Sequence, residues 1–248
     1  MSAHAEPGRG YASPQASRFF TGKPFCLLAI VGAYLLAECG LWTAGALQRE
    51  FIIAAIGWIA ACTLLQRRSA KELGVGLGGL RQSSWLVLAA ALLAAVVMVA
   101  VRGAGQPALA HRPIQLWRIW GYSFWALEQE FILNSFLFLN LERLAGTRRA
   151  IVLSALVFAV AHIPNPLLMA LTLLAGLVFC AVFARYRNIW PLAVAHALLG
   201  ITVAFSAPDS ITHHMRVGLG YHSWSHARLA APVAPASTPG LSLGSTVR

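Results

Sequence analysis

Long apolar runs joined by short connections that carry lysine and arginine limit what this chain of 248 residues can fold into. A helix needs about 20 mostly apolar residues to cross the hydrocarbon core of a bilayer. Candidate windows fall near residues 25–47, 51–65, 84–101, 115–141, 150–163, 166–184 and 189–206. Only 11% of the residues are charged, against roughly 25% in soluble domains, so a water-soluble globule is excluded. The sequence predicts an all-α, polytopic membrane helix bundle of about seven transmembrane helices.

The nineteen lysines and arginines give the chain a net charge of +11, and their placement predicts its orientation. If the N-terminus is cytoplasmic, alternate connections hold twelve of them, whereas the opposite connections hold three, Arg49, Arg102 and Arg112. Basic residues gather in the cytoplasmic loops of membrane proteins. We therefore expect a multi-pass protein of a bacterial inner membrane with a cytoplasmic N-terminus. Because the cations lie in short loops beside spans, anionic lipids are expected partners and nucleic acid is not.

Three regions are predicted from this pattern. Residues 1–24 form a cytoplasmic N-terminal segment, and residues 25–206 form the membrane-embedded helical domain, in which residues 115–206 carry the motifs. Residues 207–248 are rich in Ala, Pro, Ser and Gly, a composition typical of a disordered tail that adds no core.

Titratable side chains inside the predicted spans are candidates for function, because charged groups at bilayer depth are costly and usually functional or paired. They are Glu38, Arg118, Glu128, Glu130, His162 and His196. With a helical rise of about 1.5 Å per residue, the last four lie at similar depths on three different helices. We therefore expect two carboxylates and two imidazoles to converge in the middle of the bundle.

Helical phase separates the two carboxylates of the fourth span. At about 100° per residue, Glu128 and Glu130 point about 200° apart, so the two cannot share one role. Glu130 lies on one polar stripe with Tyr122 and Asn134, which favours Glu130 as the working group. A purely structural alternative is that either carboxylate pairs with Arg118.

Several chemistries of membrane proteases are excluded by residues that the sequence lacks. Its single aspartate, Asp209, lies in the tail, so a paired-aspartate protease is excluded. No HExxH motif indicates a zinc site and no GxSxG surrounds a serine, and neither a metal nor a cofactor is predicted. Glutamate and histidine remain. They suffice for hydrolysis by water, with a carboxylate that takes the proton, one imidazole that shares it and a second that stabilises the oxyanion.

Three stretches in the second half of the chain carry these residues in a fixed order. Gln129 to Phe138 reads QEFILNSFLF, Phe158 to His162 reads FAVAH, and the segment beginning at His196 reads HALLG. They resemble the EExxxR, FxxxH and HxxxN motifs of the CPBP family of glutamic intramembrane proteases. That family includes the CAAX prenyl endopeptidases and bacterial enzymes thought to process C-terminal sorting signals.

The resemblance implies a role for each motif. The first glutamate of the pair activates water together with His162, while His196 and the residue four positions later form the oxyanion site. Aligned on the FLF that follows, the family's two glutamates, its arginine and its last asparagine correspond to Gln129, Glu130, Asn134 and Gly200.

A shift of one residue gives a second alignment. It places Glu128 first in the pair but puts Leu133 where the arginine belongs. We favour Glu130 and keep Glu128 as the alternative. The candidate catalytic residues are Glu130, Glu128, His162 and His196, with Gln129, Asn134, Phe158 and Gly200 in support.

The leading hypothesis is a glutamic intramembrane endopeptidase that hydrolyses a peptide bond near the C-terminus of a membrane-anchored or lipidated protein. A zinc-dependent intramembrane metalloprotease, with His162, His196 and a glutamate as ligands, is one alternative. Another is a non-catalytic membrane chaperone or scaffold of the same fold, suggested by the departures at Gln129 and Gly200.

Overall fold

The computed structural model describes residues 19–104 and 116–223. Most of the predicted N-terminal segment and the second half of the predicted tail therefore lie outside the described residues. Within the described ranges, the regular elements are all helical: α2 (Lys23–Leu41), α3 (Gly45–Leu65), α4 (Ala70–Leu73), α5 (Leu80–Ser83), α6 (Trp85–Gly103), α7 (Leu116–Glu130), the π-helix η2 (Phe131–Phe138), α8 (Leu139–Ala145), α9 (Thr147–Val160), α10 (Pro166–Tyr186), α11 (Trp190–Ser206), α12 (Asp209–Thr212) and the 3₁₀-helix η3 (His213–Met215). The predicted all-α class is confirmed.

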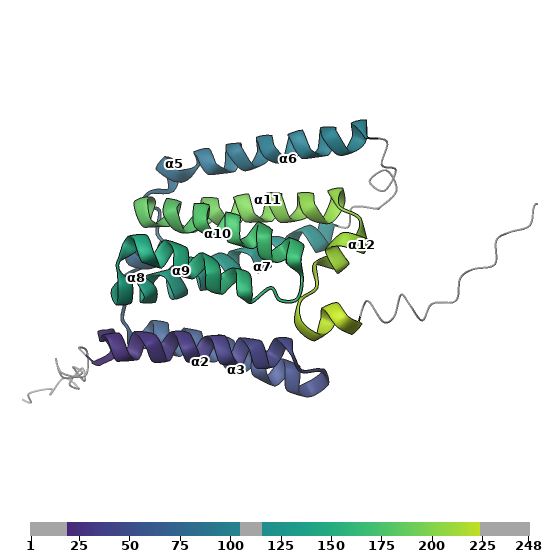
Figure 1. Cartoon of the computed structure of the whole chain (residues 1–248). Helices are drawn as coiled ribbons and strands as arrows, with labels where there is room; N and C mark the ends of the chain where they lie inside the picture. Colours follow the sequence, from purple (N-terminus) through teal and green to yellow (C-terminus); the bar gives the residue numbers. More distant parts are fainter. Residues whose placement is uncertain (1–18, 105–115, 224–248) are drawn as a thin grey trace, which may run out of the picture.

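The long helices lie side by side as a layered bundle (Figure 1). Helices α2 and α3 form a pair on one side, where α2 contacts α8. Helix α6 lies on the opposite side and packs against α11. Between them, α9 pairs with α10, and α11 packs against α7. The segment from α7 to α11 therefore forms the centre of the bundle.

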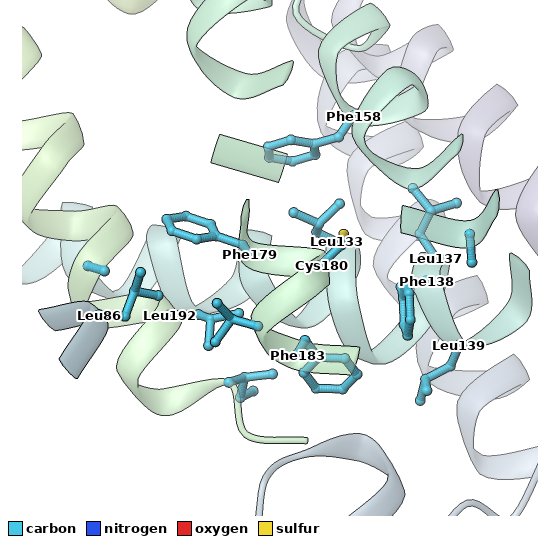
Figure 2. Close-up of a cluster of buried hydrophobic side chains, with 14 of the residues drawn as sticks. Leu86, Leu133, Leu137, Phe138, Leu139, Phe158, Phe179, Cys180, Phe183 and Leu192 are labelled. Carbon is cyan, nitrogen blue, oxygen red and sulfur yellow. The ribbon is translucent and has the colours of Figure 1, made fainter. Parts of the chain in front are cut away.

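The main hydrophobic core lies where α10 meets η2, α8 and α9 (Figure 2). The rings of Phe138 and Phe183 meet edge to face, with centroids 5.8 Å apart, and Leu133 is fully buried. Helices α9 and α10 approach closely at Gly176, where an added Cβ would lie 3.1 Å from the Cα of Ala155. This close packing fixes the position of α9 relative to the neighbouring helices.

Four helical segments are long and apolar enough to cross a membrane: α2, α3, residues 80–103 and α10. A fifth is added if α11 and the α12–η3 segment, which are bent by 119°, count as one span. Each of the seven predicted windows contains a helix, but α9 and α11 have only 14 and 17 residues. Seven membrane spans are therefore not confirmed.

The first predicted span extends too far. Helix α2 ends at Leu41, and Gly45 begins α3 with a φ of +68°. Glycine adopts this left-handed conformation without a Cβ clash, so the chain turns at residues 42–44. As a result Arg49, which the sequence pattern placed in a connection, lies inside α3.

The chain beyond α11 is folded as far as residue 223, although the sequence predicted disorder from residue 207. The side-chain amide of Asn165 donates to the carbonyl oxygens of Thr212 and Arg216, at 2.9 and 3.1 Å. The backbone amide of Gly218 donates to the carbonyl oxygen of Ile163 at 2.8 Å. These bonds tie the segment to the turn between α9 and α10, and composition gives no sign of them.

Replacing Asn165 by alanine is expected to destabilise this end of the bundle. Besides its two donated bonds, the fully buried Asn165 side chain caps α10 by accepting from the amide of Leu168 at 3.1 Å. Loss of these bonds should lower the free energy of unfolding by about 2–3 kcal/mol. The measurement is the melting temperature in one fixed detergent, with the exposed Ser223→Ala as control. Equal melting temperatures for Asn165→Ala and the unmodified protein would contradict this prediction.

Candidate active site

Glu130 lies at a change of helical geometry. It is the last residue of α7, and the next eight residues, Phe131–Phe138, form the π-helix η2. A π-helix has i→i+5 hydrogen bonds, and such segments occur frequently at functional sites. Every residue from 133 to 140 is buried. Glu130 therefore lies shortly before a continuous stretch of buried residues in the same helical segment.

Both carboxylate oxygens of Glu130 have a partner from the predicted set. Oε1 lies 2.8 Å from Nδ1 of His196, and Oε2 accepts from the side-chain amide of Asn134 at 2.7 Å. The Glu130 side chain is 0% exposed and that of His196 is 15% exposed. The structure thus brings together an acid from α7, an amide from η2 and an imidazole from α11. Of the two carboxylates and two imidazoles expected to converge, one of each is in contact.

The amide oxygen of Asn134 is buried and has no hydrogen-bond partner among the described residues. Buried polar groups are usually satisfied by protein or by ordered water. This oxygen is therefore an acceptor available to a water molecule or to a substrate N–H beside Glu130.

Glu128 and Gln129 do not join this cluster. Both side chains are half-buried, and within the described part of the chain no hydrogen bond or ion pair links either to Glu130 or His196. Their different phase on α7 explains this separation. The side chain of Arg118, the ion-pair partner considered for either carboxylate, lies outside what the structure describes.

His162 follows the last residue of α9 and is half-buried. Its Nδ1 lies 2.7 Å from the carbonyl oxygen of Phe158, and the two rings meet edge to face with centroids 4.9 Å apart. Because a carbonyl oxygen only accepts, Nδ1 carries the proton and Nε2 keeps its lone pair. The carbonyl oxygen and the ring of Phe158 therefore hold the imidazole of His162 in one orientation. No hydrogen bond joins His162 to Glu130 in the described residues.

Gly200 lies one helical turn after His196, and the tyrosine ring of Tyr122 packs directly against it. A Cβ built on Gly200 would collide with the hydroxyl oxygen of Tyr122. The space that a longer side chain would use is thus filled by α7. The sequence placed Tyr122 on the polar stripe of α7 but gave no indication of its contact with Gly200.

Restoring the asparagine of the HxxxN motif is expected to destabilise the protein. Gly200→Asn overfills the space held by Tyr122, and such overpacking costs about 1–3 kcal/mol. In a Tyr122→Ala background the same substitution should have a much smaller effect. Melting temperatures of the two single variants and the double variant measure this coupling. If the changes in melting temperature of the two single variants simply add in the double variant, the contact between Tyr122 and position 200 is not the cause of the destabilisation.

The fold and the site define an all-helical membrane protein with a buried acid–imidazole pair between two of its helices. A family model described as type II CAAX prenyl endopeptidase, Rce1-like, matches residues 81–202, which extend from α5 into α11. The membrane core of this chain belongs to that CAAX protease-like family, also called CPBP, which is a family of membrane peptidases. No curated protein and no solved structure gives a significant match.

Proposed function

We propose that the protein is a glutamic intramembrane endopeptidase that hydrolyses a peptide bond near the C-terminus of a membrane-anchored or lipidated protein. The contact between Glu130 and His196, 2.8 Å long and buried in the bundle, carries this proposal. Family membership supports peptidase activity. We also propose that the protein lies in a bacterial inner membrane with its N-terminus in the cytoplasm, on the charge asymmetry of its connections.

The proposed reaction requires one particular set of protonation states in this pair. With Glu130 as carboxylate and His196 as imidazolium, Nδ1–H of the ring donates to Glu130, and Nε2–H stays available to a developing oxyanion. Nε2 of His162 accepts a hydrogen bond from the attacking water and orients it. Tyr122, whose hydroxyl lies against Gly200, is a side-chain donor on the same face as His196.

Hydrolysis then proceeds without a covalent intermediate. A proton of water passes to the Glu130 carboxylate while the water oxygen bonds to the carbonyl carbon. The carbonyl electron pair moves to oxygen, where His196 stabilises the negative charge. The oxyanion then re-forms the C=O bond, the C–N bond breaks, and the leaving nitrogen takes the proton from Glu130, which becomes a carboxylate again.

The two alternatives predict different measurements. Within the described residues, no group of three or more His, Cys, Asp or Glu side chains is placed to hold a metal ion, which does not favour the zinc alternative. A chaperone or scaffold is favoured by the engagement of both Glu130 oxygens and by the Gly200 departure, because either feature suits a binding cavity without turnover.

The experiment is cleavage by the purified full-length protein in liposomes, with a substrate anchored by a C-terminal apolar helix. We expect one cleavage near the C-terminus, measured by mass spectrometry, at a rate unchanged by a strong metal chelator. Loss of activity on chelation and recovery with zinc would favour the metalloprotease. Binding of the substrate with no cleavage under any condition would favour the chaperone.

A further inference from the structure

A pocket of about 450 Å³ lies at the end of the bundle where α3, α8 and α10 end. Four of its lining side chains are cations and two are acids: Arg68, Lys71, Arg143, Arg187, Glu72 and Glu142. The pocket lies beyond the N-terminal end of α9, whereas His162 follows its C-terminal end. At about 1.5 Å per residue, the 14 residues of α9 put about 20 Å between the two places. The basic pocket is therefore separate from the candidate active site.

Both acids of the basic pocket already have partners. Glu142 accepts from Arg187 through both carboxylate oxygens, at 2.7 and 2.8 Å, so this pair is internally neutralised. The carboxylate of Glu72 accepts from the backbone amide and the hydroxyl of Ser69 at the start of α4. These hydrogen bonds hold the pKa of Glu72 below its ordinary value. Both carboxylates are therefore already hydrogen-bonded within the protein.

Three cations of the basic pocket have no carboxylate in hydrogen-bond contact among the described residues. Within the described ranges, the Arg68 side chain donates only to the side-chain oxygen of Asn140, at 3.0 Å. The side chains of Lys71 and Arg143 make no hydrogen bond or ion pair within the described part of the chain. With four cations and two acids in its lining, the pocket keeps a net charge of +2.

Two guanidinium nitrogens in the basic pocket are buried and have no acceptor among the residues that the structure describes. They are Nε of Arg68 and Nη1 of Arg143. Burial, followed by the positive charge of Arg143 nearby, lowers the pKa of Arg68 to about 10. Two neighbouring cations with unmet donors are costly in a partly buried site unless an anion joins them. The two nitrogens are therefore donors available to an anion with several acceptor oxygens.

We propose that the basic pocket binds an anionic phosphoryl group, one whose negative charge is not offset by an attached cation such as choline. A phosphoryl group offers several acceptor oxygens, which match the forked donors of arginine and the point charge of lysine. Helices α3 and α10 are both long and apolar enough to cross a membrane, and the pocket lies at their ends. The pocket is thus placed at the level of lipid headgroups, where anionic lipids attract basic segments. The phosphoryl group comes either from an anionic phospholipid or from a soluble phosphate.

The test uses the purified full-length protein in a neutral detergent, with the melting temperature as the readout. Phosphatidylglycerol, phosphatidylcholine and inorganic phosphate are titrated separately. We expect phosphatidylglycerol or inorganic phosphate to raise the melting temperature, and phosphatidylcholine to have little effect. Lys71→Gln and Arg143→Gln should each raise the midpoint of the titration about tenfold, the effect of one lost charge-assisted contact.

The matched control is Arg149→Gln, which removes an exposed cation at the start of α9 that does not line the pocket. This variant should titrate like the unmodified protein. The Lys71 side chain makes no hydrogen bond or ion pair among the described residues, so Lys71→Gln decides the question even if Arg143→Gln fails to fold.

Each outcome has a definite meaning. A response to phosphatidylglycerol alone assigns the site to a lipid headgroup, and a response to inorganic phosphate alone assigns it to a soluble phosphate. A response to both also supports a phosphoryl site. Equal responses to the two lipids with none to phosphate overturn the proposal, as does an Arg149→Gln effect as large as that of Lys71→Gln, because that result indicates diffuse surface charge.

Discussion

Replacing Glu130 by glutamine is expected to lower the rate of peptide-bond cleavage by about 10²- to 10⁴-fold, the usual contribution of a general base. Glutamine has nearly the same shape, and its oxygen can still accept from Asn134, which donates to Oε2 in the native site. Because of this similar shape and retained bond, the Glu130→Gln protein should fold and enter the membrane like the unmodified protein. The glutamine side chain cannot take a proton from water, however, so the general base is lost. The measurements are the cleavage rate in liposomes and the melting temperature in detergent.

Glu128→Gln is the matched control, because it makes the same chemical change two residues away on the same helix. Glu128 is half-buried and lies apart from the Glu130–His196 contact, so this variant should keep nearly full activity. The opposite pattern would transfer the role of base to Glu128. Full activity in both single variants and in the double variant would rule out hydrolysis by a glutamate.

Replacing His162 by alanine is expected to lower the cleavage rate by about 10²-fold or more, because the attacking water loses the imidazole that orients it. The effect on stability should be small. Among the described residues, the ring makes one hydrogen bond, which is local, to the carbonyl oxygen of Phe158, and such a bond contributes about 1 kcal/mol. Cleavage rate and melting temperature, measured on the same preparation, separate the two effects.

The control for this variant is His222→Ala, which removes an exposed imidazole from the folded segment that follows α11. It should leave activity unchanged. In cells, the His162→Ala variant should behave like a deletion of the protein if the protein is an enzyme. A retained cellular function in this variant would instead favour the chaperone or scaffold.

The sequence predicted the helical class and the approximate place of the long helices, because apolar length is a strong and local signal. Helix ends were less accurate. The turn before Gly45 depends on one left-handed residue within an otherwise apolar run, which periodicity does not detect. The folded segment after α11 depends on bonds from Asn165 to residues 47 and 51 positions later. Such long-range bonds have no local signature.

At the candidate site, helical phase predicted that Glu130 and Asn134 share a face, and the two side chains are hydrogen-bonded. Depth predicted that His196 lies at the same level, and it contacts Glu130. Regular α-helical geometry gave no indication of the π-helix that follows Glu130. Nor did it indicate that Tyr122 fills the space beside Gly200, because that contact joins two helices far apart in the chain.

The π-helix makes the length of the segment 131–138 part of the machinery. Each hydrogen-bonded turn in it spans one residue more than a turn with i→i+4 bonds. If the segment closed into ordinary α-helix with all its residues kept, everything before it would rotate by about 100° relative to α8. Glu130 would then swing away from His196 although no residue had changed. Deleting one residue here removes the extra residue of the wide turn, so a relative that is one residue shorter in this stretch is expected to form plain α-helix and to keep the acid–imidazole contact.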